Sequence, residues 1–179
     1  MSIGGAIGWL AAKAPKQPLI THEGLTLTRA EFEQRTNRLA RAYQERGVGQ
    51  DSMVTIALPN GIAFFEACVA AWKLGATPQP VSAKLPVLER RAIIELAGPA
   101  LIVGAPDDTG RGIASLDASF EPPVSLSDAP LEDRTARYWK AATSGGSTGR
   151  PKLIVAKQSG MTDPESDRQT SFAEGRRHV

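Results

Sequence analysis

The stretch 144–152 concentrates residue types that bind phosphate groups. Its sequence is Ser-Gly-Gly-Ser-Thr-Gly-Arg-Pro-Lys, and it lies between the apolar segments 138–142 and 153–156. Glycines let backbone N–H groups approach an anion closely, hydroxyls add neutral donors, and a lysine supplies a mobile positive charge. We therefore predict a loop between two buried strands that binds a polyphosphate. The residues expected to contact it are Ser144, Gly145, Gly146, Ser147, Thr148, Gly149 and Lys152.

Two known phosphate motifs and one ordinary alternative can be compared with this stretch. A Walker A loop requires Gly-Lys-Ser/Thr, whereas Gly149 is followed here by Arg150 and Pro151. No G-x-G-x-x-G opens a helix anywhere in the sequence, so a dinucleotide fingerprint is excluded. A plain polar turn remains the alternative, although such a turn needs neither the closing Pro-Lys nor three hydroxyls. We expect Arg150 to face solvent.

The composition limits the classes of protein to which the chain can belong. It has 179 residues, 41% of them hydrophobic, and a net charge of +2, which suits one globular domain and gives no basic run for nucleic acid. The lone Cys68 lies in an apolar helix-like segment, where we expect a buried structural thiol. No metal-ligand cluster and no transmembrane run is present, and no positive residue precedes the apolar segment 3–12. We therefore expect a cytoplasmic protein without a resident metal site.

Helical and strand patterns alternate along the first hundred residues. Thr28 and Glu31 form a capping-box pattern at the start of a helix that Gly47 should end. Continuous apolar strands favour an α/β layered fold with a mainly parallel sheet, because such strands are covered on both faces. The expected helices are 3–12, 28–46, 62–74 and 86–97, and the expected strands are 19–20, 25–27, 53–58, 77–81 and 100–103.

Helical spacing also predicts which side chains are buried. The predicted inner faces comprise Phe32, Thr36, Leu39, Ala40 and Tyr43 in one helix, Ile62, Phe65, Val69 and Trp72 in the next, and Leu88, Ile93, Ile94 and Ala97 in the last. The arginines at 35, 38 and 41 are expected on a solvated face.

The last third of the sequence has a different character. We expect a long surface connection over 106–137 with a short strand at 124–126, and we place the folded part in 1–160. The polar tail 161–179 is expected to be largely disordered, because it has too few apolar residues to offset the entropy of ordering.

The loop and the scaffold together resemble the adenylate-forming enzymes, the superfamily of acyl-CoA synthetases, luciferases and peptide-synthetase adenylation domains. Ser144, Gly146 to Gly149, Pro151 and Lys152 fall on its phosphate-binding motif, whereas Gly145 and Leu153 depart from it. This variant of the loop is most similar to the steroid and bile-acid CoA ligases. Short motifs outside the loop, among them Leu58-Pro59-Asn60 and Lys73-Leu74-Gly75-Ala76, extend the resemblance over about residues 9–160.

The resemblance implies an ATP-dependent acid–thiol ligase. In that family a carboxylic acid and ATP form an acyl-adenylate and pyrophosphate, and coenzyme A then takes the acyl group. The loop would hold the β- and γ-phosphates. The family's catalytic lysine, Mg²⁺-binding segment and acyl pocket lie downstream of this loop, so we expect no catalytic or metal residue in the chain and no activity of the chain alone.

Two other hypotheses remain open from the sequence. The chain could be a truncated, non-catalytic protein that keeps this α/β half and binds a nucleotide or a partner. It could also associate with another copy or chain through the part of its core that the missing half would leave exposed.

Overall fold

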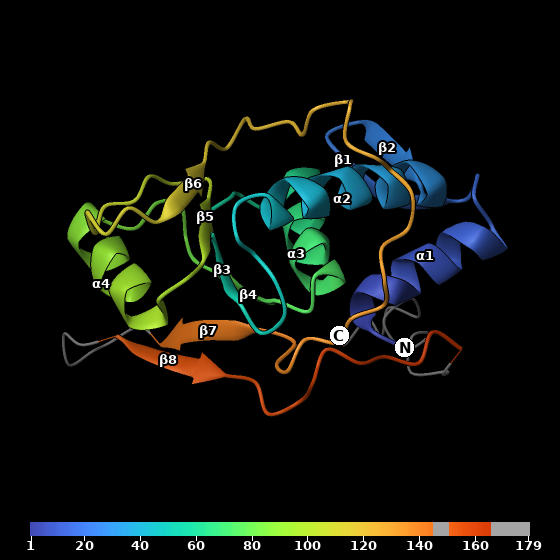
Figure 1. Ribbon diagram of the computed structural model, residues 1–179. Coiled ribbons are helices and arrows are strands. Elements are labelled where there is room, and N and C mark those ends of the chain that lie inside the picture. Colours follow the sequence, from blue (N-terminus) through green and yellow to red (C-terminus); the bar gives the residue numbers. More distant parts are fainter. Residues whose placement is uncertain (145–150, 166–179) are drawn as a thin grey trace, which may run out of the picture.

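The computed structural model describes residues 1–144 and 151–165 as an α/β fold built on a parallel sheet (Figure 1). This sheet has four strands in the order β4-β3-β5-β6, and every neighbouring pair is parallel. The strands are β3 (Met53–Ile56), β4 (Thr77–Pro80), β5 (Leu101–Val103) and β6 (Ala114–Leu116). The mainly parallel α/β arrangement predicted from the sequence is confirmed.

Helices cover both faces of the sheet. The helices are α1 (Ile3–Lys13), α2 (Arg29–Gln44), α3 (Ile62–Lys73) and α4 (Val87–Ala97). Val54 and Ile56 pack with residues of α2 and α3, whereas Ile102 packs with Ile93 and Ile94 of α4. Because successive side chains of a strand point to opposite faces, α2 and α3 cover one face and α4 covers the other.

Local sequence signals explain where several elements begin and end. Thr28 and Glu31 form the complete capping box at the start of α2, with each side chain bonded to the other residue's backbone N–H. Glu23 and Gly24 have positive φ angles of 49° and 82° in the turn between β1 (Pro18–His22) and β2 (Leu25–Thr28). The predicted hairpin and the predicted start of α2 are therefore confirmed. Helix α2 ends slightly before Gly47, at Gln44.

Some predicted inner faces are wrong at single positions. Phe65 of α3 is exposed, and the side chain of Leu88 is 80% exposed, because α4 turns only the Ile93–Ile94 stripe toward the sheet. Val124 is 92% exposed, and 124–126 forms a turn rather than the expected short strand. The strand of this region is β6 instead, at the edge of the sheet.

The arginines of α2 do not form a simple solvated face, which corrects the expectation for Arg35, Arg38 and Arg41. Arg35 forms an ion pair with the buried Glu66 of α3. Arg38 pairs with Asp128, and Arg41 donates hydrogen bonds to the carbonyls of residues 127 and 129 at 3.0 and 2.8 Å. The Arg35 pair joins α2 to α3, and the contacts of Arg38 and Arg41 fasten the long connection 106–137 to α2.

The two ends of the described chain lie side by side. The N–H of Ile3 donates to the carbonyl of Gly160 at 2.8 Å, and Ser2 forms a bridge with Met161. The start of the predicted polar tail is therefore attached to the fold, and residues 166–179 lie outside the described residues. No helix within the described ranges is long and apolar enough to cross a membrane.

Candidate functional site

The predicted phosphate loop joins the two strands of an antiparallel hairpin. Strands β7 (Ala141–Ser144) and β8 (Lys152–Val155) pair in a register that places Ser144 opposite Lys152 and Ala141 opposite Val155. The first and last residues of the motif are therefore backbone neighbours at the end of the hairpin that carries the loop. This register places the two ends of the 144–152 motif next to each other on paired strands.

Hydrogen bonds to α3 and β4 hold the start of the hairpin. The indole N–H of Trp72 donates to the carbonyl of Trp139 at 2.7 Å, and the hydroxyl of Thr77 donates to the carbonyl of Tyr138 at 3.1 Å. Strand β7 lies against β4, and β8 contacts α4 (Figure 1). The hairpin is thus fixed to the parallel sheet through the backbone that precedes β7. Sequence reasoning did not identify these anchoring residues.

The two strands of the hairpin differ in burial, which corrects part of the prediction. Ala141 of β7 is fully buried, as expected for a covered strand. Strand β8 alternates between exposed and half-buried residues, and Ile154 is 56% exposed. The expectation of two buried strands is therefore wrong for β8. Its apolar sequence indicated burial, but only one of its faces is covered.

Lys152 is the one charged residue of the motif that the structure describes. Its side chain is exposed and forms no ion pair with the residues in 1–144 or 151–165. An unpaired ammonium group at the base of a glycine-rich loop can approach an anion without first breaking an internal ion pair. The chemistry of this donor therefore fits a phosphate group.

Thr143 is a further candidate that the sequence analysis did not include. Its hydroxyl oxygen is buried and has no hydrogen-bond partner among the described residues. In the hairpin register it lies opposite Leu153, one position before Ser144. Its position at the start of the run of hydroxyl residues was the signal that could have identified it.

The remaining candidate residues belong to the middle of the motif. Residues 145–150, which include Gly145, Gly146, Ser147, Thr148 and Gly149, lie outside the described residues, and Ser144 is placed through its backbone at the end of β7. Across the described ranges, no group of three or more His, Cys, Asp or Glu residues could hold a metal ion.

Comparison with known sequences identifies relatives along nearly the whole chain. The sequence model of the family described as AMP-binding enzyme matches residues 8–171. The pyochelin synthase PchD of Pseudomonas aeruginosa is 32% identical over 179 aligned positions, which cover 86% of this chain and 32% of that protein. The glycine betaine reductase ATRR of Emericella nidulans is 28% identical over 79% of this chain and 12% of its own length. The chain thus spans a third or less of these two relatives.

Comparison with solved structures shows the same fold. The o-succinylbenzoate CoA synthetase MenE of Bacillus subtilis, solved with an acyl-adenylate intermediate, superimposes with a TM-score of 0.73 at 19% identity. The match covers 83% of this chain and 41% of the synthetase. A fatty acyl CoA synthetase of Mycobacterium tuberculosis also gives a TM-score of 0.73 at 19% identity, over 86% of this chain and 34% of the enzyme.

Proposed function

Because the chain belongs to the AMP-binding enzyme family, we propose that it is the N-terminal part of an ATP-dependent ligase that activates a carboxylic acid as an acyl-adenylate. The observation that carries this proposal is the family match over residues 8–171, which includes the whole 144–152 motif. The hairpin register adds support, because it places Ser144 and Lys152 on either side of the loop.

We assign residues 144–152 to the β- and γ-phosphates of ATP. Adenylate formation transfers negative charge to the departing pyrophosphate, so it is favoured by N–H donors and cations that surround those oxygens. Lys152 would supply the cation, Ser144, Ser147 and Thr148 would supply hydroxyl donors, and the glycines would expose backbone N–H groups. Mg²⁺, held by residues that we place outside 1–179, would neutralise part of the phosphate charge when bound.

We propose coenzyme A as the acceptor of the acyl group. We also propose that the reaction takes place in the cytoplasm. Two of the solved relatives are named as CoA synthetases, whereas another is named as a nonribosomal peptide synthetase. The 32% identity to a pyochelin synthase favours the second candidate, an adenylation unit of a peptide synthetase. The form of the loop suggests a steroid or bile acid as the substrate that is activated.

ATP–pyrophosphate exchange tests the proposed reaction. The assay uses the protein encoded by the complete reading frame around these residues, with cholate, a medium-chain fatty acid, substituted benzoates and amino acids as separate substrates. We expect acid-dependent exchange with one of these classes. The Lys152→Ala variant should exchange at least about tenfold more slowly, because charge-assisted hydrogen bonds contribute about 1.5–3 kcal/mol.

The 179-residue chain serves as a second arm of the same assay. We expect no exchange from it, because the catalytic and acyl-binding groups of the family lie downstream. Exchange by the 179-residue chain would contradict the placement of the catalytic and acyl-binding groups downstream of it. Absence of exchange by the complete protein with every acid would contradict the proposed function. A coupled assay that offers coenzyme A to the adenylate then tests the acceptor.

A further inference from the structure

Two side chains of the parallel-sheet region hold the chain directly before the phosphate-loop hairpin, which is formed by β7 and β8. The indole N–H of Trp72, in the last turn of α3, donates to the carbonyl of Trp139 at 2.7 Å. The hydroxyl of Thr77, the first residue of β4, donates to the carbonyl of Tyr138 at 3.1 Å. Both acceptors are main-chain carbonyls, so these bonds fix the path of the backbone whatever side chains residues 138 and 139 carry.

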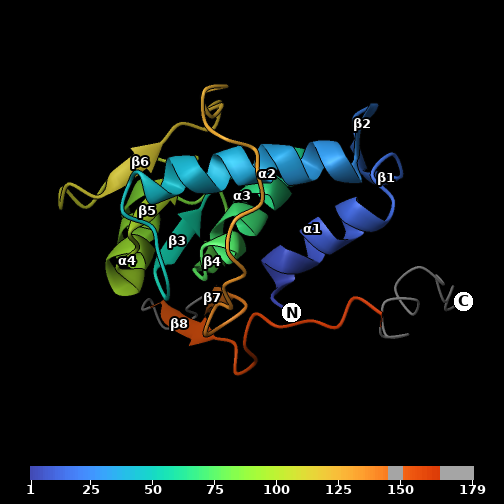
Figure 2. The same ribbon diagram turned by 45° about the vertical axis from the view of Figure 1, so that its right-hand side comes forward.

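The backbone of Trp139 also belongs to the hairpin. Its N–H donates to the carbonyl of Gln158 at 3.1 Å, and the N–H of Ala156 donates to the carbonyl of Lys140 at 3.0 Å, so the two chains stay paired beyond β7 and β8. Figures 1 and 2 show the hairpin next to β4 and α4, on the side of the molecule away from α2. Residues 138 and 139 are therefore the place where side-chain hydrogen bonds connect the hairpin to α3 and β4.

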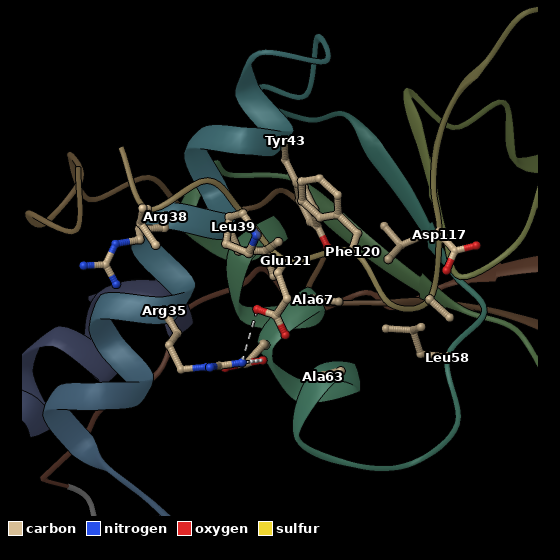
Figure 3. Close-up of a pocket in the computed structure, with 15 residues that line it drawn as sticks. Arg35, Arg38, Leu39, Tyr43, Leu58, Ala63, Ala67, Asp117, Phe120 and Glu121 are labelled. Atoms are coloured by element: carbon tan, nitrogen blue, oxygen red, sulfur yellow. Dashed lines mark hydrogen bonds and ion pairs between the residues drawn. The ribbon is translucent and has the colours of Figure 1, made fainter. Parts of the chain in front are cut away.

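The helix that carries Trp72 is firmly held in the fold. The indole packs against two of the apolar clusters of the core. Ion pairs of Glu66 with Arg35 and of Lys73 with Glu33 join α3 to α2. Figure 3 shows the Arg35 side chain extending from α2 toward α3. A donor on such a rigid element gives the hairpin a fixed reference point.

The hairpin makes the position of the loop sensitive to its base. Ser144 lies five residues after Trp139, which corresponds to about 17 Å of extended strand. A rotation of the hairpin about its base therefore moves the loop further than it moves the base. A binding group that must first be returned to its place binds more weakly, because part of the binding free energy goes into ordering it.

We propose that Trp72 and Thr77 are positioning residues of the phosphate loop, whose hydrogen bonds hold the hairpin in the orientation in which residues 144–152 bind phosphate groups. This inference rests on the function proposed above for that motif. Both side chains act through the carbonyls of residues 138 and 139. Coupling of this kind is reciprocal, so a phosphate group bound at the loop strengthens these hydrogen bonds by the same factor.

Calorimetric titration of the 179-residue chain with pyrophosphate tests Thr77 first. Thr77→Val removes the hydroxyl of this buried residue and keeps its β-branched shape, so we expect binding about three- to tenfold weaker, the range of one net hydrogen bond. Thr77→Ser keeps the hydroxyl and should restore the affinity of the wild type.

The same titration tests Trp72 against a matched tryptophan. Trp72→Phe removes the indole N–H and should weaken binding by a similar factor. Trp9 lies in α1, where its ring faces the Lys13 ammonium, so Trp9→Phe should bind pyrophosphate as the wild type does. Denaturant unfolding of each variant shows separately how much stability the substitution costs.

The indole N–H resonances give a readout that a merely structural role would not change. The chain has three tryptophans, so the ¹⁵N-labelled protein gives three indole resonances, which Trp9→Phe and Trp72→Phe assign. Saturating pyrophosphate should move the Trp72 resonance downfield and slow its exchange with water, and it should leave the Trp9 resonance unchanged. If Trp72→Phe does not fold, Trp9→Phe and the Thr77 variants keep the test complete, because this shift is measured in the wild type.

The outcomes separate this inference from the function on which it rests. The inference is wrong, and the phosphate assignment stands, if Lys152→Ala weakens binding while Thr77→Val binds as the wild type does or the Trp72 resonance does not move. Equal losses in Thr77→Val and Thr77→Ser would show that packing, rather than the hydroxyl, acts at this position, and would also overturn it. Absence of pyrophosphate binding by the wild type would overturn both.

Discussion

The parallel sheet and the phosphate-loop hairpin are built on different principles. The sheet is covered by helices on both faces, and Ile102 at its centre is 0% exposed. The hydrogen bonds that hold the hairpin reach it through the backbone before β7, β8 contacts α4, and Ile154 of β8 is 56% exposed. Stability is therefore concentrated away from the residues proposed to bind phosphate. Substitutions in the hairpin can test function without unfolding the protein.

Replacing Lys73 in the helical layer and Lys157 after the hairpin should give the largest difference in stability between the two regions. Lys73 of α3 is buried against Glu33, with its Nζ 2.7 Å from the carboxylate, and burial lowers the pKa of Lys73 more than Glu33 raises it. Lys73→Ala would leave the buried Glu33 carboxylate with the hydrogen bond from Asn37 but without its ion-pair partner, so we expect the free energy of unfolding to fall by about 3–5 kcal/mol. Chemical denaturation measures this value.

Two further variants control this measurement. Lys157 is exposed after β8 and makes no ion pair with the described residues, so Lys157→Ala should change stability by less than about 0.5 kcal/mol. The double variant Glu33→Gln/Lys73→Met should recover most of the loss, because replacing both ions avoids an unpaired charge. Equal effects of the two single lysine variants would contradict the comparison.

A pair of isoleucines tests the same contrast in apolar packing. Ile102→Ala removes a fully buried side chain from β5 and should cost about 2–5 kcal/mol, through lost burial and the cavity left behind. Ile154→Ala removes a side chain that is more than half exposed in β8 and should cost about 1 kcal/mol or less. Thermal and denaturant unfolding compare them directly. A larger loss at Ile154 would show that the hairpin belongs to the core.

The buried thiol of Cys68 should make the stability of the parallel-sheet region depend on pH in the alkaline range. Burial raises the pKa of the Cys68 thiol to about 12. The unfolded thiol ionises near pH 8.5 while the folded thiol stays neutral, so stability is full below that pH and falls as the pH rises toward the folded pKa. The fall should approach about 1.4 kcal/mol per pH unit between pH 9 and 10.

Cys68→Ala identifies the source of this pH dependence. The variant should lose that slope and keep the hairpin unchanged. Burial also raises the pKa of Tyr43, which adds a similar loss only above about pH 10, so the comparison is made below that value. An identical slope in Cys68→Ala and the wild type would contradict the prediction.

The sequence predicted the layered fold well where local signals act. The capping box of Thr28 and Glu31 and the continuous apolar strands β3 and β5 depend on residues close in the sequence, and all were placed correctly. The sequence analysis did not predict strand β6, because its three residues, Ala114–Leu116, form no continuous apolar run. Its pairing with β5 comes from tertiary structure.

Long-range partners explain most of the remaining errors. Arg35 and Arg38 were expected to face solvent because their partners, Glu66 and Asp128, are 31 and 90 residues away in the sequence. Leu88 fits a helical stripe, but α4 is short and only part of that stripe reaches the sheet. For the candidate site, the motif predicted the loop and its position between two strands. The exposure of β8 depends on which face the neighbouring elements cover.

Titration calorimetry of pyrophosphate against the 179-residue chain tests the central claim most directly, with Lys152→Ala and the matched variant Lys157→Ala. We predict saturable binding that weakens at least about tenfold in Lys152→Ala, because a charge-assisted contact contributes about 1.5–3 kcal/mol. Lys157→Ala should bind within about twofold of the wild type, since that exposed lysine lies outside the motif. Absence of binding by the wild type, or equal affinities of the wild type and Lys152→Ala, would contradict the assignment of residues 144–152 to phosphate.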